Sequence, residues 1–373
     1  MGKFKASIID KLGFRLNVLL LLGLLLTYPV PYLNPEHFWF MALLGLAYPI
    51  FVSLTLICVA WWLFRKKWKY LLANIVVIVL GGFLHLQSFA VNVLPAEFTA
   101  EKSMKVMSYN VQNFDLYNWT ENLDSRNKII KLIQTENPDV ICFQEFYTEE
   151  ESQGDFHNVK LLVNDLGYQH YHFEKTLTLK TTKHWGIAIF SKFPIENSAA
   201  VKFSNSKNNV AVYADIKADS LVFRLFNTHL QSIHLGRADL EYVKNITKGA
   251  EEGKEKDHIK ASKSIIEKLK AAYQKRGAQA RILAKELKKS PYPTIICGDF
   301  NDTPTSYTYK TIRQDLKDTF LETNFGVGGT YAGPIPALRI DYALVDTIFQ
   351  VKSFNVLSET YSDHYPIVTT IGY

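Results

Sequence analysis

Cysteine is scarce in this chain of 373 residues, which contains only three. Cys58 lies in an apolar run, and Cys142 and Cys297 each lie in a short run with the composition of a β-strand. Three cysteines with no Cys-x-x-Cys spacing indicate neither a disulfide framework nor a cysteine-based metal site. We therefore expect all three side chains to be small buried hydrophobic groups.

Acidic residues are almost absent from residues 1–93, which contain only Asp10 and Glu36 against eight Lys or Arg. This part carries the whole formal net charge of +6, which leaves 34 basic and 34 acidic residues in the rest of the chain. A protein that neutralises many phosphates has a basic face within its binding domain. The basic overall balance is therefore no evidence for a nucleic-acid surface, although a local basic patch remains open.

Lys, Arg, Asp and Glu are missing from three long apolar stretches, residues 16–35, 38–64 and 70–95. Each reaches the length of about 18 to 20 residues that a helix needs to cross a bilayer. We predict a membrane domain over residues 1–95 with three transmembrane helices. A signal peptide is the alternative for the first stretch, but no small-residue cleavage site follows it.

The basic residues of this domain predict its orientation. They lie before the first stretch and between the second and third, at Arg65, Lys66, Lys67 and Lys69. Because positive residues favour the cytoplasmic side, three crossings place the remainder of the chain on the opposite side. We expect an integral protein of the plasma or inner membrane whose C-terminal domain is extracytoplasmic.

After a polar linker at residues 96–104, short strands alternate with helices. A helix is expected at residues 124–137, with Ile129, Ile130 and Ile133 on its inner side. This mixture predicts an α/β sandwich over residues 105–373. A charged helical region begins near residue 235, and residues 235–265 look like an insertion. Strands are expected at residues 104–111, 140–143, 186–190, 210–216, 221–226, 295–297, 342–345 and 367–371.

Polar groups recur at the ends of these strands. Asp299 and Asn301 follow the strand at residues 295–297, in the position where open α/β sheets bind ligands. A polar turn is the alternative for any one of these groups taken alone. The other candidates with carboxylate, amide or imidazole side chains are Asn110, Glu145, His229, Asp341, Asp363 and His364.

Seven motifs in order carry a family resemblance. They are Ser108-Tyr109-Asn110-Val111, Ile141-Cys142-Phe143-Gln144-Glu145, Gly186-Ile187-Ala188-Ile189-Phe190-Ser191, Asn227-Thr228-His229-Leu230, Gly298-Asp299-Phe300-Asn301, Arg339-Ile340-Asp341-Tyr342 and Ser362-Asp363-His364-Tyr365-Pro366. From about residue 105 to its end, the chain resembles the endonuclease/exonuclease/phosphatase superfamily. The resemblance implies a four-layered α/β sandwich, in which two β-sheets are flanked by helices.

The resemblance also implies metal-assisted attack of water on a phosphate ester. Glu145 is the first choice as a ligand of Mg²⁺, for which Mn²⁺ is a possible substitute, and Asn110 and Asp363 would complete or orient that shell. Asp299 would hold and deprotonate the water, with Asn301 beside it. The remaining candidates are a pair formed by His364 and Asp341, and His229 as a donor to the phosphate. Whether a second metal binds stays open.

The substrate class stays open as well. The candidates are an extracytoplasmic endonuclease, a lipid phosphodiesterase or phosphatase similar to sphingomyelinases or phosphoinositide phosphatases, and a noncatalytic receptor for a phosphorylated ligand. The expected partners are a phosphate-ester substrate, either nucleic acid or a phospholipid head group, and the lipid bilayer. No obligate protein partner is expected.

Overall fold

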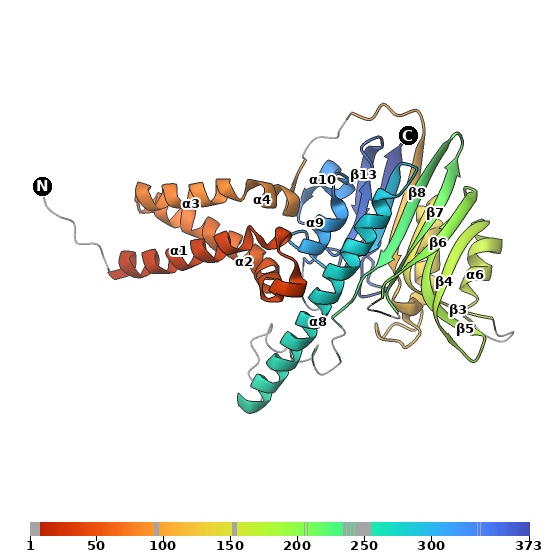
Figure 1. The fold of residues 1–373 in the computed structure, drawn as a ribbon, viewed down its shortest axis with the longest axis horizontal. Helices are drawn as coiled ribbons and strands as arrows, with labels where there is room; N and C mark the ends of the chain where they lie inside the picture. The colour runs from red at the N-terminus through yellow and green to blue at the C-terminus, as the bar shows by residue number, and fades with distance from the viewer. Residues whose placement is uncertain are drawn as a thin grey trace, which may run out of the picture.

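The structure is a computed structural model, which describes residues 8–92, 97–150, 155–204, 206, 208–233, 236, 239, 242, 255–333, 335 and 337–373. A group of N-terminal helices projects from one side of a larger domain built on two β-sheets (Figure 1). We call this larger part the two-sheet domain.

The N-terminal helices are α1 (Ile8–Thr27), the short 3₁₀ helix η1 (Val30–Tyr32), α2 (Pro35–Phe64), α3 (Trp68–Leu80) and α4 (Gly82–Ser88). By length and composition, α1 and α2 are able to cross a membrane. The pair of α3 and α4 adds a third span only if the two are counted together. Three spans were predicted from the sequence, and the structure has two helices that are long enough to span a membrane and one bent pair in their place.

The break in the third segment has a local cause. The axes of α3 and α4 differ by 65° across Gly81. A Cβ atom at Gly81 would lie 2.3 Å from a ring carbon of Tyr28. The Tyr28 hydroxyl donates a hydrogen bond of 2.8 Å to the backbone carbonyl of Val77. A glycine and an inserted side chain are recognised causes of helix kinks. Because Gly81 and Tyr28 do not interrupt the apolar pattern of the sequence, the break was not predicted.

Each sheet of the two-sheet domain has six strands. Among the strands that the structure describes in these sheets, only the pairs β2–β3 and β8–β9 are parallel, and the other neighbouring pairs are antiparallel. The first sheet has the order β13 (Gln350–Val356), β14 (Ile367–Gly372), β2 (Ser103–Asn110), β3 (Val140–Glu149), β5 (Lys183–Ser191) and β4 (His170–Leu179). The second has the order β10 (Lys317–Asp318), β12 (Asp341–Val345), β9 (Thr294–Asp299), β8 (Leu221–His229), β7 (Val210–Ala218) and β6 (Ile195–Lys202).

Three hydrophobic clusters hold the layers of this domain together. The largest fills the space between the sheets and includes Val106, Cys142 and Cys297, all fully buried. A second cluster packs α5 (Ser125–Glu136) on the outer face of the first sheet. The third packs α8 (Glu255–Lys288) and α9 (Tyr307–Arg313) on the outer face of the second sheet. The predicted four-layered α/β sandwich is thus confirmed.

Short elements complete the described structure. They are η2 (Gln112–Asp115), α6 (Asn158–Lys160), η3 (Leu161–Asp165), α10 (Thr319–Thr323) and the two-stranded pair of β1 (Ala90–Val91) with β11 (Phe325–Gly326). The three cysteines are free, and Cys58 is only half-buried. Most of the predicted insertion at residues 235–265 lies outside the described residues, and α8 covers its last part.

The N-terminal helices pack directly on the two-sheet domain. The Gln274 side chain donates to the backbone carbonyl of Glu36 at 3.2 Å, and Arg281 forms an ion pair with the Glu36 carboxylate. A Cβ atom at Gly277 would lie 2.7 Å from Pro35, so the glycine permits the close approach of α2 and α8.

Another contact lies beside the loop that follows β9. The Thr305 hydroxyl donates to the backbone carbonyl of Gly45 in α2 at 2.8 Å. The buried Gln87 side chain in α4 donates to the backbone carbonyl of Pro304. The loop that begins at Asp299 is therefore anchored on two of the N-terminal helices.

Candidate functional site

The registers of three neighbouring strands place three polar side chains on one rung of the second sheet. His229 at the end of β8 is opposite Asp299 at the end of β9, and Asp299 is opposite Asp341 at the start of β12. In the first sheet, Asn110 at the end of β2 is opposite Gln144. These strand ends lie on the same side of the two sheets, so the polar groups of one sheet face those of the other.

A β-bulge directs Glu145 toward this place. The pairing of β3 with β5 shifts register between Phe143 and Phe146, and Glu145 adopts a left-handed backbone conformation with φ of 50°. Bulges redirect side chains, and left-handed residues other than glycine are concentrated at functional sites. The Glu145 side chain remains 33% exposed, so it is open to a ligand.

Asp299 is positioned by the residues on both sides of it. Gly298 has φ of 138°, and a Cβ atom there would lie 2.1 Å from the backbone oxygen of Thr228. Only glycine therefore lets β9 approach β8 this closely. Asn301 then folds back on the carboxylate, because its backbone N–H donates to Oδ1 at 2.8 Å and its side-chain amide donates to Oδ2 at 2.9 Å.

Oδ2 of Asp299 is the point at which the candidate side chains converge. The Asn110 amide donates to it at 3.2 Å and to Oε1 of Glu145 at 3.4 Å. Nε2 of His229 lies 3.6 Å from Oδ2 of Asp299 and 3.7 Å from Oε1 of Glu145. Nε2 of His364 lies 3.6 Å from the same Asp299 oxygen.

His364 and Asp341 form a buried pair. Nδ1 of His364 lies 2.9 Å from Oδ2 and 3.2 Å from Oδ1 of Asp341. The Thr330 hydroxyl accepts hydrogen bonds from the backbone N–H groups of Ile340 and Asp341, both at 3.0 Å. The ring of Tyr331 packs edge-on against the His364 ring at 5.7 Å. Thr330 and Tyr331 were not identified from the sequence.

Asp363 lies at the margin of the site. Its backbone N–H donates to the Gln112 side chain at 3.3 Å, and the neighbouring Ser362 hydroxyl donates to the backbone carbonyl of Asn110 at 2.7 Å. Asp363 influences Glu145 through its charge, since it contributes to the raised pKa of that carboxyl. The structure thus gathers all eight predicted residues in one region, and their individual roles stay predictions.

Burial perturbs the titration of the central groups. Removal from water raises the pKa of Asp299 to about 6, with a further contribution from Asp341. Removal from water and the charge of Asp363 raise the pKa of Glu145 to about 7. For His364, burial opposes the charged form, but the Asp341 and Asp299 carboxylates outweigh it and hold the pKa well above its usual range.

The donor set suits a divalent cation. Four carboxylates face only two imidazoles, so the site by itself carries an excess of negative charge that repels a phosphate. Mg²⁺ prefers such oxygen ligands and needs only one or two carboxylates. Ligand atoms of Asp299, Asp341 and His364 lie within 4.8 Å of one another. However, Asp341 engages Nδ1 of His364, whereas the partly exposed Glu145 side chain is more accessible to a ligand.

Asn110 forms hydrogen bonds through both ends of its side-chain amide. Its side-chain oxygen accepts from the backbone N–H of Gln112 at 3.1 Å, while its amide nitrogen faces Glu145 and Asp299. The Asn110 amide thus bonds to both carboxylates, and its predicted place in the metal shell stays a prediction.

Comparisons with known proteins agree with this geometry. The sequence profile of the Endonuclease/Exonuclease/phosphatase family matches residues 107–364. A second profile, Domain of unknown function (DUF8431), matches residues 10–89. No curated protein matches the chain.

Solved structures share the fold of the two-sheet domain. An endonuclease/exonuclease/phosphatase from Beutenbergia cavernae is 19% identical with a TM-score of 0.50, over 73% of this chain and 72% of that one. A humanized D. rerio TDP2 is 14% identical with a TM-score of 0.50, over 73% of this chain and 99% of that one. On the family profile, the fold and the ordered motifs, the chain belongs to the endonuclease/exonuclease/phosphatase family.

Proposed function

We propose that this protein is a membrane-anchored, Mg²⁺-dependent hydrolase of phosphate esters whose two-sheet domain lies outside the cytoplasm. The observation that carries the proposal is the convergence of Asn110, His229, Asn301 and His364 on the Asp299 carboxylate, next to Glu145. A structural polar turn does not require these groups to come from separate strands of two sheets.

Asp299 is the proposed general base. Asn301 fixes its orientation, and the carboxylate takes a proton from the attacking water. The water oxygen forms a bond to phosphorus as the bond from phosphorus to the ester oxygen breaks. His364, kept charged by Asp341, and His229 donate hydrogen bonds to phosphoryl oxygens and stabilise the charge that develops there.

Glu145 is the proposed first ligand of Mg²⁺, and Asn110 and Asp363 would complete or orient its shell. A bound Mg²⁺ or Mn²⁺ supplies Lewis-acid polarisation of the phosphoryl group and offsets the negative charge of the site. Asn110 holds the Glu145 and Asp299 carboxylates in a common orientation.

A nucleic acid is the first candidate substrate, as in the nuclease members of the family. The second candidate is a phospholipid head group, favoured by one specific contact. Thr305, six residues after Asp299, bonds to Gly45 within a helix able to cross a membrane. This contact keeps the loop of the site close to the proposed bilayer surface.

A panel of substrates tests the function. The full chain in mild detergent should hydrolyse bis-p-nitrophenyl phosphate with Mg²⁺ and lose this activity with a chelator. Plasmid DNA, RNA, phosphoinositides and sphingomyelin then separate the substrate classes, because activity on lipids alone would remove the nuclease candidate. Binding of phosphorylated ligands with no hydrolysis of any substrate would contradict the proposed enzyme and support a receptor.

A further inference from the structure

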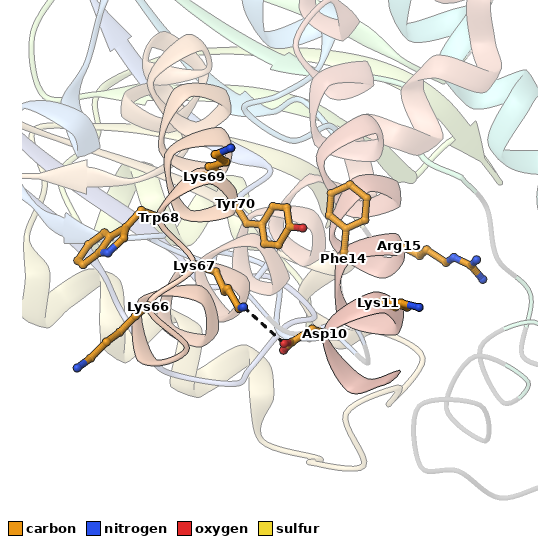
Figure 2. A pocket seen from close by; sticks show the side chains of 9 residues that line it. All are labelled: Asp10, Lys11, Phe14, Arg15, Lys66, Lys67, Trp68, Lys69 and Tyr70. Atoms are coloured by element: carbon orange, nitrogen blue, oxygen red, sulfur yellow. Dashed lines mark ion pairs between the residues drawn. The ribbon is translucent and has the colours of Figure 1, made fainter. Parts of the chain in front are cut away.

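The starts of α1 and α3 are the ends of these helices farthest from the two-sheet domain (Figure 1). A hollow lies between them (Figure 2). Its volume of about 530 Å³ is within the range of small-molecule binding sites. The lining residues come from the start of α1, from the segment that joins α2 to α3 and from the first turn of α3: Asp10, Lys11, Phe14, Arg15, Lys66, Lys67, Trp68, Lys69 and Tyr70.

Positive charge dominates this lining, which contains five cations and a single carboxylate. The carboxylate belongs to Asp10, which is buried and already paired. Nη2 of Arg65 lies 2.9 Å from its Oδ1, and Nζ of Lys67 lies 3.9 Å from its Oδ2. Asp10 is thus not available to neutralise the other cations of the hollow.

Four cations around the hollow lack such a partner. Among the residues that the structure describes, no carboxylate forms an ion pair with Lys11, Arg15, Lys66 or Lys69. In Figure 2, Lys11 and Arg15 project from α1 on one side of the hollow, and Lys66 projects on the opposite side from the segment before α3. Residues 1–7 contain no Asp or Glu, so they add no acidic partner. Four long basic side chains without a carboxylate partner are therefore available to bind an anion.

The floor and surroundings of the hollow are apolar. The rings of Phe14 and Tyr70 lie between the two helices with their centroids 4.9 Å apart. Beside them, the side chains of Leu12, Trp68 and Leu72 are 68%, 64% and 61% exposed. This surface continues along helices that are apolar enough for a bilayer, so it suits the acyl chains attached to an anion held above it.

We propose that this hollow binds the phosphate of an anionic glycerophospholipid. The unpaired cations hold the phosphate, and the neighbouring apolar surface covers the upper part of the acyl chains. The inference rests on the proposed membrane anchoring, but not on hydrolysis. A basic cluster at the end of a membrane helix also directs topology. Topology alone does not require a hollow with an aromatic floor, whereas basic pockets of this kind suit lipid head groups.

Lipid retention by the full chain tests the proposal. The protein is purified in a mild detergent and examined by native mass spectrometry with phosphatidylglycerol or phosphatidylcholine. We expect preferential retention of phosphatidylglycerol. The variant Lys11→Gln/Arg15→Gln/Lys69→Gln should bind it at least about tenfold more weakly, because each basic residue near the head group contributes on the order of 1 kcal/mol. Equal retention of the two lipids by the natural protein would overturn the proposal.

Matched controls separate the possible causes of weaker phosphatidylglycerol binding. The variant Lys131→Gln/Lys160→Gln/Lys285→Gln removes three exposed charges from the two-sheet domain and should keep the lipid preference. Unchanged midpoint temperatures of unfolding confirm that both variants fold. If inorganic phosphate or glycerol phosphate displaces phosphatidylglycerol at equal concentration, the site binds a soluble anion and the lipid assignment is wrong.

The result of the lipid-retention test is independent of the proposed hydrolysis of phosphate esters. A protein that retains phosphatidylglycerol but hydrolyses no phosphate ester contradicts the enzyme and leaves the lipid site in place. Release of the protein from membranes by alkaline carbonate contradicts the anchoring itself. An integral protein without a preference for the anionic lipid contradicts only the lipid site.

Discussion

Arg339 donates a hydrogen bond of 3.0 Å from its guanidinium to the backbone carbonyl of Gln87 in α4. Another nitrogen of the same group pairs with Asp318 at 2.6 Å, and both side chains of this pair are buried. Arg339 lies two residues before Asp341, and the Gln87 side chain bonds to Pro304, five residues after Asp299. Gln87 thus connects the bent pair of α3 and α4 to both segments that carry the proposed catalytic carboxylates.

Gln87→Ala should therefore affect both stability and turnover. The substitution leaves the Pro304 carbonyl without its side-chain donor, and an unsatisfied buried polar group costs about 1 to 3 kcal/mol. We expect a lower midpoint temperature of unfolding and a lower kcat with little change in KM. Gln169→Ala is the matched control, because Gln169 makes a similar bond to a backbone carbonyl on an exposed surface. Equal effects of the two substitutions would show that the α4 contact does not support the site.

Asp299→Asn should lower kcat while preserving the fold. A general base contributes about a hundredfold to ten-thousandfold in rate, and the amide of Asn cannot accept the proton. The substitution keeps the size of the side chain and removes a buried carboxyl whose pKa is raised to about 6. Steady-state hydrolysis and circular dichroism measure the two effects. A loss of activity smaller than tenfold would exclude Asp299 as the base.

The metal-free protein should lose stability as the pH rises from about 4 to about 7. The pKa of Asp299 rises from 3.8 to about 6 on folding, and that of Glu145 rises from 4.5 to about 7. In this window the folded state binds more protons than the unfolded state, so stability falls with pH. His364 affects stability in a higher pH range. Its stabilising contribution is complete below pH 6.5 and is lost only as the pH rises through its raised pKa.

The unfolding midpoint measured against pH, with a chelator or with Mg²⁺, checks this expectation. Mg²⁺ should remove most of the decrease, because it binds the ionised carboxylates of the folded state. The variant Glu145→Gln/Asp299→Asn should show a flatter profile that does not respond to Mg²⁺. The same slope in this variant would mean that other groups cause the pH dependence.

Asp341 and His364 should act as one unit. Asp341→Asn removes the carboxylate that helps to keep His364 charged, so the alkaline limit of activity should move to lower pH. His364→Gln should lower kcat by a similar factor, and the double variant should be little worse than either single one. Rates measured across pH for the four proteins provide the test. Losses that multiply in the double variant would show that the two residues act separately.

The central parts of the fold were predictable from the sequence, whereas its edges were not. The three isoleucines of α5 face the core as expected, and the predicted strands correspond to strands of the two sheets. The strands of the two sheets that were missed, β4, β6, β10 and β13, are all at the edge of a sheet. An edge strand such as β4 buries few side chains, so it lacks the apolar run on which the prediction depends.

The residues of the candidate site were likewise only partly predictable from the sequence. Residues at strand ends, such as Asp299 and Glu145, belong to ordered motifs and were identified. Thr330 and Tyr331 lie in a loop without a pattern, and they reach Asp341 and His364 only through the tertiary fold. The contact between Gln87 and Pro304 spans 217 positions in the chain, and no local signal predicts such a pairing.

The most direct test of the account is the Mg²⁺ dependence of bis-p-nitrophenyl phosphate hydrolysis by the full chain and by Glu145→Gln. We expect saturable activation of the natural protein by Mg²⁺. The variant should need a much higher Mg²⁺ concentration and reach a far lower rate. Hydrolysis that is unaffected by a chelator, or an identical Mg²⁺ response in the two proteins, would contradict the proposed metal-assisted phosphoesterase.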